Sequence, residues 1–170
     1  MLPPVEAAKY RTQAQSQYGV LLGGRSELFV SLRAFFDSPI LGHGSWPENP
    51  EYVYARLDEV DKAGAGFMDI SVMEENISTF LIPTHSYIMG ALVWGGFFAG
   101  LFWFKTLAAV SKGLLNKAVV SSPLLLYISL ALVWSILFSP FGADARWIST
   151  VQLSTYYLIL SNINRRSKNK

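Results

Sequence analysis

A lone histidine occupies the position in this chain that best suits chemistry. His85 stands in the segment Pro83-Thr84-His85-Ser86, directly before a long apolar run that begins at Tyr87. Because hydrocarbon cannot hydrogen-bond a backbone, such a run is predicted to be a helix packed in a bilayer. A neutral imidazole at the mouth of that helix can accept a proton from a hydroxyl at the membrane surface, where a lipid-linked substrate would lie. A histidine at an interface is often only a polar anchor, so both interpretations stay open at this point.

Other sequence features narrow the chemistry. The chain contains no cysteine, which excludes disulfides, thiolate nucleophiles and cysteine-ligated metals. Two acidic pairs, at 58–59 and 74–75, have the composition of a glycosidase dyad, but adjacent residues do not face one another. No phosphate-binding loop, nucleophile elbow, metalloprotease helix or calcium loop occurs. The second histidine, His43, lies between two glycines and is interpreted as an exposed turn residue.

Charge is distributed unevenly along the chain. Residues 1–85 hold eleven of the twelve acidic side chains and six of the fourteen Lys and Arg, whereas the remainder holds eight basic residues and only Asp144. The basic groups lie beside apolar runs and do not form a stripe on a soluble domain. This pattern argues against nucleic acid as a partner and favours a lipid bilayer.

Three apolar runs predict an all-α integral membrane protein with an additional extracytoplasmic loop segment. We expect transmembrane helices at about 87–110, 122–141 and 147–163. The third run is interrupted by polar residues such as Gln152, so it spans only if other helices cover its polar edge. Residues 86–163 would then form the membrane part of the protein.

The basic residues that flank these runs predict their orientation, since Lys and Arg are enriched on the cytoplasmic side of membrane helices. They lie between the first two runs and after the third: Lys105, Lys112, Lys117, Arg165, Arg166, Lys168 and Lys170. We therefore expect a multi-pass membrane protein, with residues 1–85 outside, in the periplasm or its equivalent, and a basic cytoplasmic tail at 164–170.

Two observations indicate that further membrane helices accompany this chain. Residues 1–85 carry no basic-then-apolar signal that would carry them across a membrane. The first apolar run also contains small residues spaced four apart, which let neighbouring helix backbones approach closely: Ala91/Gly95, Gly95/Ala99 and Gly96/Gly100. We expect the chain to be the C-terminal part of a larger multi-helix protein, or a truncated descendant of one.

The outer segment contains one clear amphipathic helix. Apolar residues recur at helical spacing between about residues 25 and 37, and the stripe they form is expected to face the membrane. Ser38-Pro39 ends this helix, and a glycine-containing turn follows. Residues 46–80 are interpreted as a variable acidic loop, with short helices at 50–60 and 72–80.

Two motifs in this order resemble the O-antigen ligase and polymerase superfamily. The stretch Gly23-Gly24-Arg25-Ser26-Glu27-Leu28-Phe29, followed by Phe36-Asp37-Ser38-Pro39-Ile40-Leu41-Gly42-His43-Gly44, is similar to that family's Gly-Arg helix and Pro-Leu-Leu-Gly-x-Gly turn. Thr84-His85-Ser86-Tyr87, before a glycine-rich apolar helix, resembles its His-Asn or His-Ser signature. The similarity covers about residues 20–140, the C-terminal part of a protein that normally has ten or more membrane helices.

The resemblance implies a glycan transferase of the bacterial inner membrane, with residues 1–85 facing the periplasm, that acts in surface polysaccharide or lipopolysaccharide biosynthesis. The glycan would pass from a polyprenyl (undecaprenyl) diphosphate carrier to a hydroxyl of a lipid or protein acceptor, without a metal or other cofactor. His85 would take the proton of the acceptor hydroxyl, and Arg25 and Arg33 would bind the diphosphate, because a guanidinium offers a planar fork of donors to phosphate. Ligase, polymerase and protein glycosylation remain open.

A non-catalytic role is the alternative hypothesis. The chain would then be a membrane remnant or an accessory subunit that packs through the glycine face of its first apolar helix. A transporter is disfavoured, because no ionisable residue lies central to any of the three runs.

Overall fold

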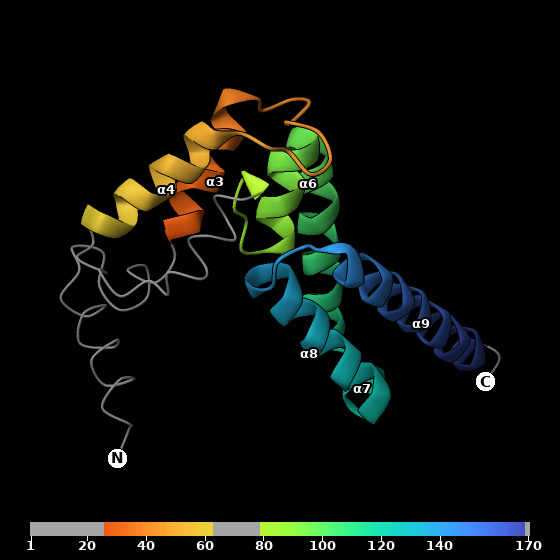
Figure 1. Ribbon diagram of the computed structural model, residues 1–170. Coiled ribbons are helices and arrows are strands. Elements are labelled where there is room, and N and C mark those ends of the chain that lie inside the picture. Colours follow the sequence, from red (N-terminus) through yellow and green to blue (C-terminus); the bar gives the residue numbers. More distant parts are fainter. Residues whose placement is uncertain (1–25, 63–78, 169–170) are drawn as a thin grey trace, which may run out of the picture.

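The computed structural model describes residues 26–62 and 79–168, and within these ranges the fold is helical and contains no strand (Figure 1). The helices are α3 (Ser26–Asp37), α4 (Pro50–Lys62), α6 (Tyr87–Gly113), α7 (Lys117–Val120), α8 (Pro123–Phe138) and α9 (Ala143–Lys168). An outer unit built from α3 and α4 lies at one end of α6, and α7 lies near the other end (Figure 1).

The predicted helices of the outer segment are confirmed for α3 and α4, while most of the helix expected at 72–80 lies outside the described residues. The face of α3 that packs into the protein is not the apolar stripe that was expected to face the membrane. Val30 and Ala34 are fully buried against α4 and α6, whereas Phe36 is 71% exposed. The helix stops at Asp37, because the residue before a proline is held out of the helical conformation.

The first apolar run does not form the expected single straight helix. Gly96 has φ 66° and ψ −160°, so α6 is divided into two arms, Tyr87–Gly95 and Phe97–Gly113. The rings of Tyr87 and Trp103 are 5.0 Å apart between centroids. In a straight helix these residues would be separated by roughly 24 Å along the axis. The two arms are therefore folded back on one another.

The turn after α3 fills the break in α6. His43 and Gly44 donate their backbone N–H groups to the carbonyls of Val93 and Trp94, at 2.7 and 3.0 Å. Phe97 in turn donates its N–H to the Pro39 carbonyl at 2.7 Å. These bonds satisfy backbone groups that the interrupted helix leaves open, which is what allows irregular backbone inside an apolar region.

Glycine is required where the turn meets the bend. A Cβ on Gly96 would lie 2.2 Å from the Ile40 carbonyl oxygen, and one on Gly42 would lie 2.6 Å from the Gly95 nitrogen. Gly95 and Gly100 are likewise covered within α6 itself, by Ala99 and Leu92. The small residues that were expected to contact neighbouring helices are thus used for packing inside this chain.

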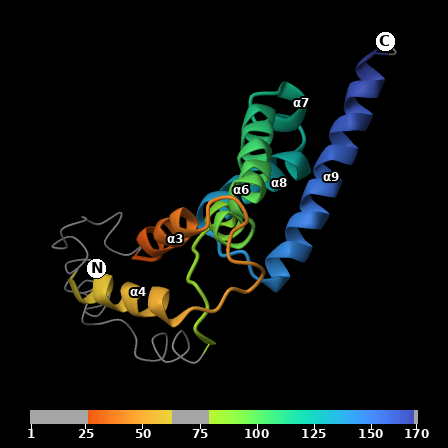
Figure 2. The same cartoon turned by 90° about the horizontal axis from the view of Figure 1, so that it is seen from above.

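Helix α8 packs on α6, and α7 and α9 pack on α8. Leu125, Leu132 and Ile136 of α8 are fully buried in the same core cluster as Trp103. Helix α9 starts before the predicted residue 147 and runs at an angle to α6 and α8 (Figure 2). Its Trp147 is 74% exposed, so a broad apolar face of α9 has no cover within the described residues.

Of the three expected spans, α6 is the one described helix that is long and apolar enough to cross a membrane, and α8 is a shorter apolar helix of 16 residues. The bend at Gly96 limits the straight part of α6 to the arm Phe97–Gly113. That arm is about 25 Å long at 1.5 Å per residue, slightly less than a hydrocarbon core of about 30 Å.

Candidate functional site

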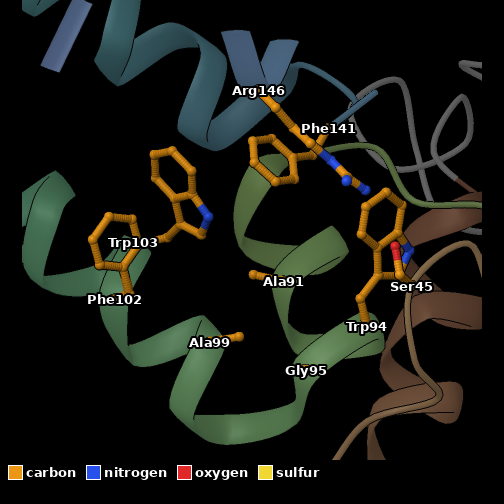
Figure 3. A pocket seen from close by; sticks show the side chains of 9 residues that line it. All are labelled: Ser45, Ala91, Trp94, Gly95, Ala99, Phe102, Trp103, Phe141 and Arg146. Atoms are coloured by element: carbon orange, nitrogen blue, oxygen red, sulfur yellow. The ribbon is translucent and has the colours of Figure 1, made fainter. Parts of the chain in front are cut away.

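Arg146, in the first turns of α9, is surrounded by aromatic rings. Its guanidinium carbon lies 4.7 Å from the ring centroid of Trp94, 5.3 Å from that of Trp46 and 5.7 Å from that of Phe141. Figure 3 shows the side chain extending from α9 between Phe141 and Trp94. These contacts join four separate segments of the chain around one positive charge.

The guanidinium of Arg146 keeps donors that nothing uses. Its Nε and Nη2 atoms are buried and have no hydrogen-bond partner among the described residues. Cation–π contacts stabilise a positive charge by about 0.5–2 kcal/mol but do not satisfy an N–H group. A buried donor without a partner costs about 1–3 kcal/mol. An anion that accepted from these atoms would remove that cost.

An apolar hollow of about 460 Å³ opens beside Arg146, between the two arms of α6 (Figure 3). Small residues provide its space and aromatic side chains form most of its wall. The residues that line it are Ser45, Ala91, Trp94, Gly95, Ala99, Phe102, Trp103, Phe141 and Arg146. Since only one of these residues is charged, the site combines a cation at its mouth with an apolar interior.

A second hollow of about 440 Å³ adjoins the aromatic rings around Arg146. It shares Trp46, Trp94 and Phe141 with the surroundings of Arg146, and it extends to Thr84. Thr84 directly precedes His85 in the chain. The rings around Arg146 therefore also line a hollow that reaches the segment carrying the predicted catalytic histidine.

His85 is exposed, in the connection that leads into α6. The next residue, Ser86, caps the helix: its Oγ accepts a hydrogen bond from the Met89 N–H at 3.1 Å. Such a cap fixes where the helix begins. The imidazole of His85 is thus held just outside the first turn and open to solvent, and its role as a base stays a prediction.

Of the two arginines expected to bind diphosphate, the structure describes one. Arg25 lies outside the described residues. Arg33 forms an exposed ion pair with Glu51 at 2.6 Å, and its guanidinium lies 6.0 Å from the ring centroid of Tyr52. It lines neither hollow. The structure therefore brings Arg146, and not Arg33, to the rings of Trp46, Trp94 and Phe141, which also line the hollow that reaches the His85 segment.

His43 is not the exposed turn residue that was expected. It is half-buried, with its Nε2 atom 2.6 Å from the Ala34 carbonyl oxygen and its ring edge-on to Tyr52 at 5.5 Å. A carbonyl only accepts hydrogen bonds, so Nε2 must carry the proton and donate it. His43 therefore fastens the turn to the end of α3.

Tyr52 connects α4 to the end of α3. Its hydroxyl donates to the Asp37 carboxylate at 2.6 Å. Burial raises the pKa of Tyr52 to about 12, and the hydrogen bond to Asp37 adds to the effect. The phenol therefore stays neutral and keeps donating at any physiological pH.

A buried ion pair completes the outer unit. The Arg56 guanidinium donates to the Glu27 carboxylate, and the two side chains are only 8% and 12% exposed. The Ser31 Oγ lies 2.7 and 2.8 Å from the carbonyl oxygens of Glu27 and Pro83, which share its single O–H donor. The ion pair thus joins α4 to α3, and the contact between Ser31 and Pro83 attaches the segment before His85 to α3.

Within residues 26–62 and 79–168, no group of three or more His, Asp or Glu side chains is arranged to hold a metal ion. No family model matches the chain, and no curated protein or solved structure matches it.

Sequence reasoning missed Arg146 because the residue was counted only as part of a basic second half. One signal was present: Arg146 is the sole basic residue in the short connection between the second and third apolar runs, and aromatic residues flank it at Phe141 and Trp147. In the predicted orientation this connection lies on the side opposite to the basic residues that flank the other ends of the apolar runs, so a cation there departs from the expected charge pattern.

Proposed function

We propose that this chain is a membrane protein that binds the anionic head group of a lipid at Arg146. The observation that carries the proposal is that Nε and Nη2 of Arg146, which lines an apolar hollow, are buried and have no hydrogen-bond partner among the described residues. Phosphate oxygens accept from two guanidinium N–H groups at once, and such charge-assisted bonds are about twice as strong as neutral ones.

The exposed apolar surface supports a membrane location. Large side chains on α6, α8 and α9 are more than half exposed, among them Phe98, Trp134 and Trp147. Patches of this extent are covered by lipid or by other protein in the native setting. We propose that the outer unit of α3 and α4 faces the periplasm of a bacterial inner membrane and that the end of α9 faces the cytoplasm.

The transfer of a glycan from a polyprenyl diphosphate is the reaction we propose at this site. The acceptor oxygen forms a bond to the anomeric carbon, and the bond from that carbon to the diphosphate breaks. The acceptor proton passes to the imidazole of His85, and the electron pair leaves with the diphosphate. We propose that Arg146 stabilises the departing anion, with Arg25 and Arg33 as the further predicted contacts.

A binding and transfer experiment tests this proposal. The full chain is reconstituted in lipid nanodiscs and titrated with a polyprenyl diphosphate, and glycan transfer is followed with a labelled carrier and acceptor. Arg146→Gln should weaken binding at least tenfold, because charge-assisted hydrogen bonds worth about 1.5–3 kcal/mol are lost. His85→Ala should leave binding intact and abolish transfer.

The same helix offers a matched control for the charge. Arg165 is exposed near the far end of α9, so Arg165→Gln removes one positive charge without touching the hollow. Its binding should equal that of the unaltered chain. Equal binding by Arg146→Gln would overturn the assignment of Arg146, and normal transfer by His85→Ala would overturn the assignment of His85.

A non-catalytic accessory subunit is the second candidate. The uncovered apolar face of α9, with Trp147 at 74% and Leu158 at 66% exposure, is the observation that favours it. Packing would then use α8 and α9, because Gly95, Gly96 and Gly100 are already covered within the chain. No detectable transfer by the unaltered chain in the reconstituted assay would support this candidate.

A further inference from the structure

We infer that the hollow between the arms of α6 holds the hydrocarbon chain of the lipid whose head group binds Arg146. This inference rests on the proposed function, since Arg146 marks the head-group end of the site. Its own support is the character of the interior, which is lined by alanine, glycine and aromatic side chains. An apolar chain gains free energy by leaving water for such a surface.

The dimensions of the hollow suit a ligand. Its volume of about 460 Å³ falls within the range of about 300–1,000 Å³ that is usual for small-molecule sites. Ala91 and Ala99 face it from opposite arms of α6 (Figure 3). Larger side chains at these two positions would occupy the space, so their small size keeps the hollow open.

The hollow also reaches the apolar outside of the protein. Phe102 lines it and is 54% exposed, and Phe98, on the same arm, is 69% exposed. A lipid chain could enter from the bilayer past these rings without crossing water. A free phosphate ion would gain nothing from this apolar route, so the combination of a cation and an apolar interior selects an anionic lipid.

The small side chain of Ala99 is therefore expected to be required for binding of the lipid's hydrocarbon chain. Nanodiscs of zwitterionic lipid that contain the full chain would be titrated with dodecyl phosphate and, separately, with inorganic pyrophosphate, and tryptophan fluorescence would report binding. Ala99→Leu should weaken dodecyl phosphate binding about tenfold and leave pyrophosphate binding unchanged. Ala109→Leu, at an exposed position of the same arm, makes the same change away from the hollow and should bind both ligands normally.

The outcomes separate this inference from the proposed function. Normal dodecyl phosphate binding by Ala99→Leu, together with weakened binding by Arg146→Gln, would overturn the proposed site for the hydrocarbon chain. The head-group site at Arg146 would still stand. Normal binding of both ligands by Arg146→Gln would overturn the proposed function itself. If Ala99→Leu does not fold, as judged by near-ultraviolet circular dichroism, Ala91→Val provides the same test from the opposite arm.

Discussion

The ring of Tyr87 lies 5.0 Å from the ring of Trp103, so the start of the first arm of α6 is in contact with the middle of the second arm. Phe141 packs on both rings, at 4.8 Å and 5.3 Å between centroids. The fold of α6, the connection before α9 and the position of Arg146 are therefore linked through a single aromatic cluster. The hollow depends on the bend at Gly96 as much as on its own lining residues.

Gly96→Ala should unfold the bend. The substitution combines an unfavourable positive φ with a Cβ placed 2.2 Å from the Ile40 carbonyl oxygen. We expect the free energy of unfolding to fall by about 3 kcal/mol or more. The thermal unfolding midpoint, followed by near-ultraviolet circular dichroism, measures it. Gly142→Ala is the control, because a Cβ there would have no atom within 4 Å. Equal midpoints for the two variants would contradict the bend.

Breaking the buried ion pair should cost far more than breaking the exposed one. Arg56→Met leaves the Glu27 carboxylate buried without its partner, and we expect the free energy of unfolding to fall by about 3–5 kcal/mol. Arg33→Gln removes the exposed pair with Glu51 and should change stability by at most about 1 kcal/mol. Unfolding midpoints compare the two variants. The double change Arg56→Met with Glu27→Leu should recover much of the loss, and equal losses in the two single variants would disprove the distinction.

The stability of the outer unit should fall above about pH 10. Tyr52 has a pKa raised from 10.0 to about 12 in the folded chain, so between these values the unfolded state loses a proton that the folded state keeps. The unfolded state is then favoured as the pH rises. The contribution is fully present below about pH 10 and is lost between about pH 10 and 12. Unfolding midpoints measured from pH 8 to 12 show the effect.

Tyr52→Phe provides the comparison for that experiment. It removes both the titrating phenol and its 2.6 Å hydrogen bond to Asp37. The variant should be less stable than the unaltered chain at pH 8, and the difference between them should shrink as the pH approaches 12. A constant difference over this range would argue against the raised pKa.

The proposed orientation predicts which positions are reachable from outside the cell. The chain has no cysteine, so one introduced thiol reports a single site. Glu51→Cys, at an exposed position of α4, should react with a membrane-impermeant maleimide in intact cells once the outer membrane is made permeable. Arg165→Cys, near the end of α9, should react only after lysis. The reverse pattern would place the outer unit in the cytoplasm.

Local sequence patterns were sufficient for the elements whose causes are local. The spacing of apolar residues predicted α3 to within about one residue of its observed start, and Pro39 accounts for its end. The apolar runs predicted the approximate ranges of α6, α8 and α9, because burial of a continuous apolar segment favours a helix wherever it occurs. The role of His85 as a base remains a prediction from motif resemblance.

Contacts between distant segments determined the rest. The bend in α6 exists because a turn that begins at Pro39 satisfies the backbone groups around Gly96, and no pattern within the apolar run encodes that partner. The surroundings of Arg146 likewise combine Trp46, Trp94 and Phe141 from three different segments. Sequence alone determined which segments are helical and which residues carry charge. Only the tertiary structure decided that Arg146 lines an apolar hollow and that its Nε and Nη2 atoms have no hydrogen-bond partner among the described residues. Both properties depend on atoms that folding brings together from distant parts of the sequence.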